Sequence, residues 1–165
     1  MLAGSDLEEQ ARAVADRCLL IDEFLSEARR GGELELRMSA PDGAEALFHG
    51  HCQQKAEAHA ELSVDLLRRA GFRAEMVRAP CCGMAGAFGF EAEHYEASRA
   101  AFERALGPAL EARPAAQLVV MGISCRKQIE HFARRPAHHL VQTLREAAEP
   151  PRASVSGCVG SPRSR

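Results

Sequence analysis

The chain has 165 residues and an apolar fraction of 46%, the size and composition of one globular domain that can bury a core. Its 21 basic and 23 acidic residues leave a formal charge of −2. We therefore expect no nucleic-acid partner, because nucleic-acid binding needs a basic excess or a basic patch. No apolar run reaches the roughly 18 residues of a membrane-spanning helix, and no secretory signal is visible, so we expect a cytoplasmic protein without a transmembrane segment.

Hydrophobic periodicity predicts helices and strands that alternate along the chain. A first helix is predicted over residues 5–30, where apolar side chains recur every three or four positions. Strands are predicted at 33–38, 44–48, 74–77, 117–121 and 138–141, with helices at 53–70, 91–106, 124–132 and from the last strand to about 149. This alternation is typical of an α/β domain that has a mostly parallel sheet with flanking helices.

The same pattern defines the domain organisation. We expect one cysteine-rich domain over residues 1–149, made of the N-terminal helix and a cysteine-bearing core at 33–149. Residues 150–165 are rich in Pro, Ser, Gly and Arg, and this composition predicts a disordered tail.

Four of the six cysteines share a position relative to the predicted strands. Cys52 follows the strand 44–48, Cys81 and Cys82 follow 74–77, and Cys125 follows 117–121. Because the loops at the carboxyl ends of parallel strands converge on one edge of the sheet, we expect these four thiols to meet there.

The other two cysteines do not share this position. Cys18 falls in the apolar stripe of the predicted first helix, so we expect a buried thiol that packs as a small hydrophobic side chain. Cys158 lies in the predicted tail and is expected to play no part.

Four thiols are the ligand count of a [4Fe–4S] cluster or of a structural zinc ion. The neighbouring residues favour the cluster. Gly83 and Gly86 let the backbone approach closely and direct N–H groups at sulfur, and His49 and His51 flank the first cysteine as further cofactor-binding candidates.

The electrostatic surroundings point the same way. Helix N-termini beside Cys52 and Cys125 should lower the pKa of both thiols. Lys55, Arg126 and Lys127 are close in sequence to these cysteines and would offset the negative charge of a cluster.

Three other functions remain open at this stage. The same four thiolates could hold a structural zinc ion in an interaction module. Cys81 and Cys82 could act directly as redox-active thiols in an enzyme. The chain could also bind no metal, if the part that completes the site lies elsewhere.

Three segments, HGHCQQKA, CCGMAGAFGFEAEHYEAS and GISCRKQIEHF, resemble the C-terminal cysteine-rich (CCG) domain of bacterial FAD-linked oxidases. Related domains occur in the iron–sulfur subunits of glycolate oxidase and anaerobic glycerol-3-phosphate dehydrogenase, and in heterodisulfide reductase. The resemblance covers about residues 19–148. It is strongest to fused FAD/iron–sulfur dehydrogenases of D-2-hydroxy acids such as D-lactate or D-2-hydroxyglutarate.

The resemblance implies that Cys52, Cys81, Cys82 and Cys125 hold an iron–sulfur cluster. A four-thiolate [4Fe–4S] cluster is the default expectation. The wider family often has a further cysteine where this chain has Gly122, so the resemblance leaves the cluster type open.

The resemblance also implies partners. We expect a redox component of an FAD-linked oxidoreductase acting on CH–OH donors, and not a complete enzyme. FAD would sit on a missing domain or a partner subunit, alongside ferredoxin-type domains or subunits. Any position at the inner face of the membrane would be reached through these partners.

Overall fold

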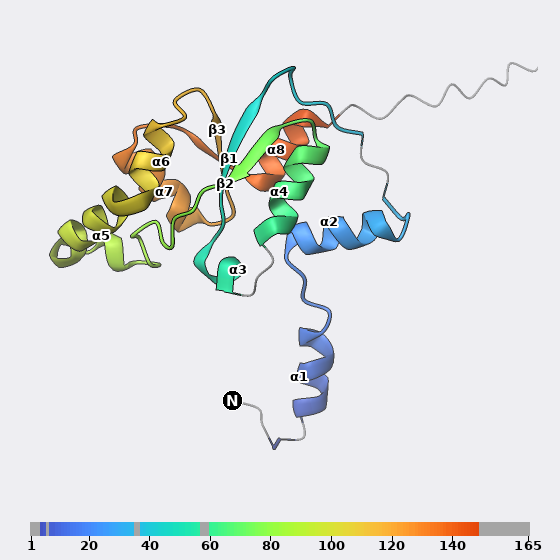
Figure 1. Cartoon of the computed structure of the whole chain (residues 1–165). Coiled ribbons are helices and arrows are strands. Elements are labelled where there is room, and N and C mark those ends of the chain that lie inside the picture. Colours follow the sequence, from blue (N-terminus) through green and yellow to red (C-terminus); the bar gives the residue numbers. More distant parts are fainter. Residues whose placement is uncertain (1–3, 6, 35–36, 57–59, 149–165) are drawn as a thin grey trace, which may run out of the picture.

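Four strands form one sheet in which every pair of neighbours is parallel. The structure is a computed structural model, and it describes residues 4–5, 7–34, 37–56 and 60–148 (Figure 1). The strands are β1 (Glu45–His49), β2 (Arg73–Met76), β3 (Gln117–Val120) and β4 (Ala137–His139), in the order β2-β1-β3-β4. The predicted α/β fold with a parallel sheet and flanking helices is confirmed.

Two helices precede β1, five lie in the connections between the strands, and one follows β4 in the described part of the chain. They are α1 (Glu8–Ala15), α2 (Ile21–Arg30), α3 (Cys52–Ala56), α4 (Ala60–Arg69), α5 (Tyr95–Ala101), α6 (Gly107–Glu111), α7 (Ile123–Phe132) and α8 (Leu140–Ala147). Short 3₁₀ turns at Phe88–Phe90 and Ala92–His94 precede α5, and a π-helical turn at Phe102–Leu106 joins α5 to α6.

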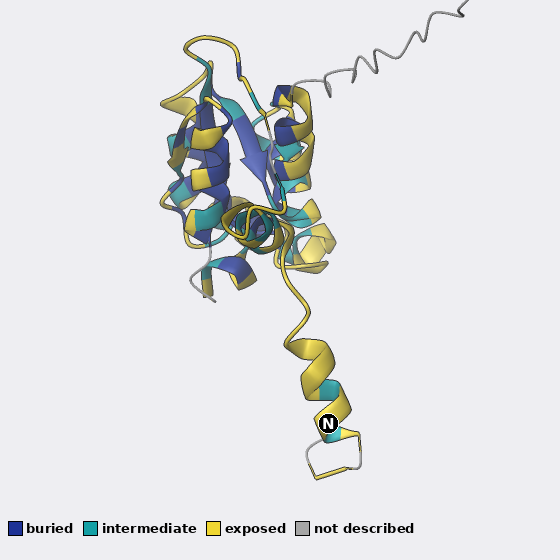
Figure 2. Ribbon diagram, turned by 90° about the vertical axis from the view of Figure 1, so that its right-hand side faces the viewer, coloured by how far each residue is buried: buried dark blue, intermediate teal, exposed yellow. Residues whose placement is uncertain are grey.

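Two hydrophobic cores lie on opposite faces of the sheet. Side chains in a strand alternate between the faces, so Phe48 of β1 packs with α4 and α8 on one face, whereas Leu47 faces the other core. On that second face, Leu118 and Val120 of β3 pack with residues of α6, of α7 and of the π-helical turn. Figure 2 shows the buried strands between the two layers.

This arrangement creates a switch in strand order beside β1. The connection from β1 to β2 carries α4 on one face, and the connection from β2 to β3 carries α5 and α6 on the other. The chain therefore leaves β1 in one direction and returns on its other side as β3. In open parallel sheets, ligands bind outside the carboxyl ends of the strands at such a point.

The prediction of one continuous helix over residues 5–30 is wrong, because this segment forms two helices. α1 ends at Ala15 and α2 begins at Ile21. α1 projects away from the body of the molecule and buries no residue (Figures 1 and 2). Cys18 lies between the two helices and is exposed, so the prediction of a buried thiol is also wrong. The apolar periodicity was present, but α1 has no neighbouring layer to pack against.

Other predicted elements differ in their ends. α7 begins at Ile123, one residue before the predicted start, after Gly122 in extended conformation. The predicted helix 53–70 is described as α3 and α4, with 57–59 outside the described residues. Residues 35–36 of the predicted strand 33–38 also lie outside them, and Met38 forms a single antiparallel bridge with Ala148.

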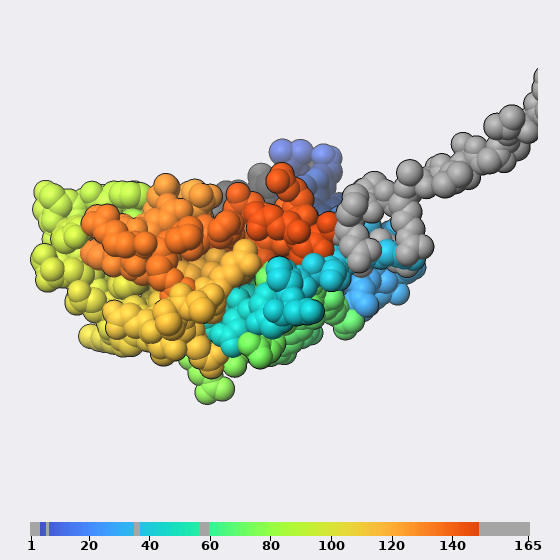
Figure 3. All heavy atoms as spheres, turned by 90° about the horizontal axis from the view of Figure 1, so that it is seen from above, coloured from blue at the N-terminus to red at the C-terminus, as the bar shows by residue number. Residues whose placement is uncertain are grey.

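The predicted tail 150–165, including Cys158, lies outside the described residues. Seen from above, the segment that contains α5 and α6 forms one end of the molecule and α2 lies at the other (Figure 3). In the described part of the chain, no helix has the length and apolar character needed to cross a membrane.

Phe48 provides a test of the first core. Its side chain is fully buried between the sheet and α4, so we expect Phe48→Ala to lower the free energy of unfolding by about 3–5 kcal/mol. Phe90→Ala removes a phenyl ring that is 69% exposed and should change the free energy of unfolding by less than about 0.5 kcal/mol. Urea denaturation of both variants measures the difference, and equal effects would contradict the described core.

Candidate metal centre

Four thiols lie together at the carboxyl edge of the sheet. Cys52 begins α3 directly after β1, Cys81 and Cys82 lie in the loop after β2, and Cys125 lies in the first turn of α7 after β3. The Sγ atoms of Cys52 and Cys81 are 3.7 Å apart. Negative charge on Cys82 raises the pKa of both Cys52 and Cys125. The loops after three strands therefore bring their thiols within electrostatic range of one another.

Two of the thiols are deeply buried. Cys82 and Cys125 are 2% and 1% exposed and belong to the second hydrophobic core. His49, at the end of β1, is equally buried, and one of its ring nitrogens and the two Sγ atoms all lie within 4.8 Å of one another. These residue types at this spacing are able to hold a metal ion.

The other two thiols form an outer pair. Cys52 is exposed and Cys81 is half-buried. The Cys52 thiol also lies 3.9 Å from the carbonyl oxygen of Pro80, at the upper limit for a hydrogen bond from sulfur. The centre thus has an inner, water-excluded side and an outer side that faces solvent.

The inner thiols differ in acidity. A hydrogen bond with Cys125 lowers the pKa of Cys82 to about 4, and smaller contributions come from His49 and from the backbone N–H of Met84. The same hydrogen bond, together with burial, raises the pKa of Cys125 above the ordinary range of a thiol. In the metal-free protein, Cys82 is therefore the thiolate and Cys125 the proton donor.

This distribution corrects the prediction that helix N-termini lower the pKa of Cys52 and Cys125. The pKa of Cys52 is raised by burial and by the neighbouring Cys81 thiol. The effect of burial and of nearby thiols outweighs any effect of the helix N-termini, and the lowered pKa belongs to Cys82 in the glycine-rich loop.

Gly83 and Gly86 have different surroundings. Gly83 has φ +95°, and its N–H donates to Cys81 Sγ at 3.3 Å. A Cβ atom at this position would collide with the carbonyl oxygen of Ser98 and lie 2.8 Å from Gln128 Nε2, so only glycine fits. Gly86 has φ +70°, and no atom would lie within 4 Å of a Cβ there. Gly83 thus contacts the thiols, whereas Gly86 shapes the turn.

His51 packs against the loop after β3. Its ring covers Gly122, where an added Cβ would lie 2.5 Å from His51 Cδ2. His51 Nδ1 accepts a hydrogen bond from the backbone N–H of Gln53 at 3.4 Å. His51 therefore packs the loops after β1 and β3 against each other, and it is not part of the buried group formed by His49, Cys82 and Cys125.

Lys55 joins the loop after β2 to α3. Its Nζ donates to the carbonyl oxygens of Ala79 and Pro80 at 2.7 and 2.8 Å. Its positive charge also lowers the pKa of Cys52 and Cys125, although other contributions dominate both shifts. This is the position expected of a cation that offsets negative charge on the thiols.

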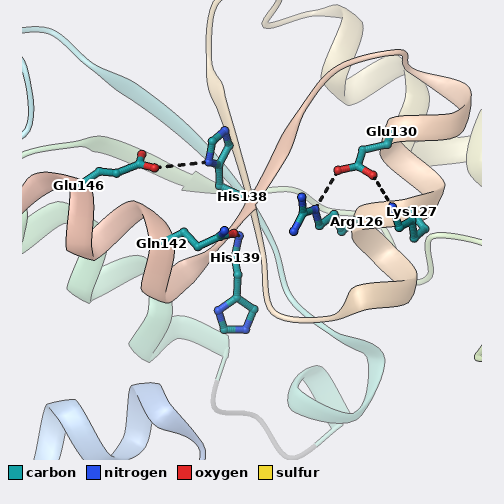
Figure 4. A network of polar contacts seen from close by, with 7 residues as sticks. All are labelled: Arg126, Lys127, Glu130, His138, His139, Gln142 and Glu146. Carbon is teal, nitrogen blue, oxygen red and sulfur yellow. Dashed lines mark hydrogen bonds and ion pairs between the residues drawn. The ribbon is translucent and has the colours of Figure 1, made fainter.

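Arg126 and Lys127 behave differently from Lys55. Both side chains turn to Glu130 on the same helix, at 2.8 and 3.1 Å (Figure 4). Arg126 and then Lys127 hold the pKa of Glu130 below its ordinary value. Their charge is thus shared with Glu130. His138 of β4 and Glu146 of α8 form a separate pair at 3.8 Å (Figure 4).

A buried polar network supports the Cys52 loop from behind. Gln54 Nε2 donates to Asp22 Oδ2 at 2.6 Å and to Ser63 Oγ at 2.9 Å, and Ser63 Oγ donates to Asp22 Oδ2 at 2.6 Å. All three side chains are 2% exposed or less. They join α2, α3 and α4 two residues after Cys52.

A second network supports the Cys82 loop. Gln128 Nε2 donates to Ser98 Oγ at 2.8 Å and to the Ser98 carbonyl oxygen at 3.3 Å, directly beside Gly83. Reasoning from the sequence missed both networks. The available signal was a serine inside an apolar helical stripe, at Ser63 and at Ser98, but nothing local indicates which distant amide it meets.

Comparison with known proteins finds relatives for most of the chain. It is 33% identical over 132 residues to a protein of Escherichia coli (strain K12) named D-2-hydroxyglutarate dehydrogenase, with 78% of this chain and 12% of the relative covered. The chain is similar to D-2-hydroxyglutarate dehydrogenases. Proteins with the same name match from Pantoea ananatis (26% over 130 residues; 78% and 12% covered) and Pseudomonas putida (28% over 101 residues; 60% and 10% covered).

The chain thus spans 12% or less of the length of these relatives. No protein-family model matches the chain, and no solved structure does. The relatives are oxidoreductases by name, in agreement with the redox family that the cysteine-bearing segments resemble.

Asp22 tests the network behind Cys52. Asp22→Ala leaves the buried Ser63 hydroxyl without its acceptor, so we expect a loss of about 1–3 kcal/mol in the free energy of unfolding. Asp65→Ala removes an exposed carboxylate that pairs with Arg68 and should cost about 0–1 kcal/mol. Chemical denaturation compares the two, and a smaller loss for Asp22→Ala would contradict the network.

The acidity of Cys82 gives a pH prediction for the metal-free protein. Because its pKa is lowered to about 4, Cys82 is a thiolate above that pH and takes up a proton as the pH falls through it. Ultraviolet thiolate absorbance should therefore fall by one equivalent near pH 4. Cys125→Ala removes the main hydrogen-bond donor and should move this step toward the ordinary thiol value of about 8.5.

Cys18→Ser, at an exposed thiol, serves as the control for this titration and should leave the acidic step in place. An acidic step that survives in Cys82→Ser would assign the low pKa to a different group.

Proposed function

We propose that the chain is an iron–sulfur electron-transfer domain that acts within a flavin-linked dehydrogenase of D-2-hydroxy acids. Cys52, Cys81, Cys82 and Cys125 would be the cluster ligands, with a four-thiolate [4Fe–4S] cluster as the default. The domain would comprise residues 1–149, with the core at 33–149. The similarity to D-2-hydroxyglutarate dehydrogenases over 78% of the chain supports this assignment.

One observation carries the proposal, namely the convergence of four thiols from three loops at the switch point of a parallel sheet. A set of buried structural thiols would be dispersed in the cores. Here the thiols share one edge, and the Cys82 thiolate is buried, where a negative charge without a compensating partner is unfavourable.

The residues present fit an iron–sulfur cluster. Backbone N–H groups already point at sulfur, from Gly83 to Cys81 and from Met84 to Cys82. Lys55 places a positive charge within range of two of the thiols. Such N–H···S contacts and nearby charges are the means by which a protein sets the reduction potential of a cluster.

When bound, the cluster would accept and release electrons one at a time. The chain's own residues would hold it, since Cys82 and Cys125 exclude water on the inner side and Cys52 leaves the outer side open toward solvent. The open side is where a partner domain could approach closely. Gln54 and Gln128, through their networks, would fix the loops that carry the ligands.

The complete reaction requires parts beyond this domain. A D-2-hydroxy acid loses two electrons and two protons to become a 2-oxo acid, and FAD on another domain or subunit would take them up. The electrons would then leave the flavin singly through iron–sulfur centres to an acceptor. Because the chain spans 12% of the matched E. coli relative, substrate binding is assigned to the remainder of such an enzyme.

Metal analysis tests the proposal. Protein prepared without oxygen should contain iron and acid-labile sulfide in equal amounts, about four of each per chain, with a broad brown absorption. Cys82→Ser should lose most of both because it removes a buried ligand, whereas Cys18→Ser should retain both.

One zinc ion without sulfide would replace the proposal by a structural zinc module. Metal-free folded protein in which Cys81 or Cys82 reacts rapidly with an alkylating agent would replace it by a thiol redox enzyme. Full iron and sulfide in Cys82→Ser would show that the ligand assignment is wrong.

A further inference from the structure

His49 occupies a position that packing alone does not explain. It is the last residue of β1, it is 1% exposed, and it lies opposite Val120 in the register with β3. Strand alternation turns its side chain to the same face as Leu47, which is the face that holds the buried thiols. An imidazole is therefore buried at the edge of the second core, on the side of the two inner thiols.

Neither ring nitrogen of His49 lies in hydrogen-bonding geometry with a described residue, and the interaction of the ring is with the Cys82 thiolate, whose pKa it lowers. A neutral imidazole has one donor and one acceptor, and burial disfavours leaving either group without a partner. The other histidine at a strand end does not share this problem, because His139 Nδ1 accepts from the backbone N–H of Val141 at 3.3 Å. The Cys82 thiolate can satisfy one ring nitrogen of His49 at most, so the other stays unpaired unless a further group binds to the ring.

The nearest candidates for sharing such a group are the two inner thiols. The ligand atoms of His49, Cys82 and Cys125 all lie within 4.8 Å of one another, and all three residues are buried. Ligand atoms at about 2.0–2.3 Å from a tetrahedral metal ion are about 3.3–3.8 Å apart. Small side-chain rotations would bring the three atoms to that spacing around one ion.

We infer that His49 is a metal ligand, and that its imidazole nitrogen joins the thiolates of Cys82 and Cys125 on the inner side of the centre. The inference rests on the metal centre of the proposed function but not on the metal being an iron–sulfur cluster. It places one nitrogen in a four-ligand set that the cysteine pattern alone would make entirely of sulfur.

A histidine ligand has a consequence for the redox properties of the centre. Imidazole binds as a neutral ligand, whereas a thiolate brings a negative charge, so a mixed set leaves the centre less negative. A less negative centre is easier to reduce, and histidine in place of cysteine raises the reduction potential of iron–sulfur centres. His49 would thus set a higher potential than four thiolates alone.

X-ray absorption at the edge of the bound metal tests the inference on the unaltered full chain, prepared without oxygen. We expect a nitrogen shell at a shorter distance than the sulfur shell. In protein grown with ¹⁵N-labelled histidine, pulsed EPR of the paramagnetic state should show a ¹⁵N coupling of the size of a directly bound nitrogen. A histidine that only donates a hydrogen bond to sulfur would produce no nitrogen shell.

Variants assign the nitrogen to a residue. His49→Ala should lose the nitrogen shell and the ¹⁵N coupling, while His51→Ala, two residues away and packed on Gly122, should keep both. His49→Cys should retain the metal with sulfur ligands only and should shift the midpoint potential downward. Even if a variant does not fold, a purely sulfur shell in the wild-type protein would overturn the inference.

The outcomes separate this inference from the proposed function. Iron and sulfide with a purely sulfur shell would overturn the role of His49 and leave the electron-transfer proposal standing. One zinc ion with a nitrogen shell that disappears in His49→Ala would support His49 and overturn the iron–sulfur proposal. A nitrogen shell lost in His51→Ala but kept in His49→Ala would overturn the inference by making His51 the ligand, and protein that takes up neither iron nor zinc would overturn both proposals.

Discussion

The parallel pairing of β1 with β3 is the constraint on which the centre depends. This pairing places the carboxyl ends of two strands side by side while their connections run over opposite faces of the sheet. The gap between the diverging connections is where side chains can gather without being covered by a helix. His49 ends one of these strands, and Cys125 lies five residues after the end of the other. The loop after β2 reaches the same edge and adds Cys81 and Cys82.

Convergence of loops would not be enough if the loops were free to move. In both supporting networks, a glutamine on a helix that carries a cysteine donates to a serine on a neighbouring helix. Gln54 follows Cys52 by two residues and meets Ser63, and Gln128 follows Cys125 by three and meets Ser98. Because buried donors must keep their acceptors, these contacts restrict the helix starts that present the thiols.

The two sides of the centre offer different chemistry. On the inner side, low polarity and close contact make Cys82 and Cys125 share one proton, which separates their pKa values widely. On the outer side, Cys52 is exposed and Cys81 is half-buried, and the positive charge of Lys55 acts on Cys52. A group bound between the two sides would be shielded from water by one pair and accessible to a partner through the other. The proposed electron transfer between domains would use this arrangement.

The sequence by itself determined the α/β class, the order of the elements and the placement of Cys52, Cys81, Cys82 and Cys125 after three strands. These features follow from local periodicity and from the rule that loops after parallel strands share one edge. Only the tertiary structure decided that residues 5–30 form two helices, because the packing surface that would select one long helix is absent around α1. It also decided that Cys82 carries the lowered pKa, and that His49 is buried beside Cys82 and Cys125, since burial and contact depend on residues far apart in the chain.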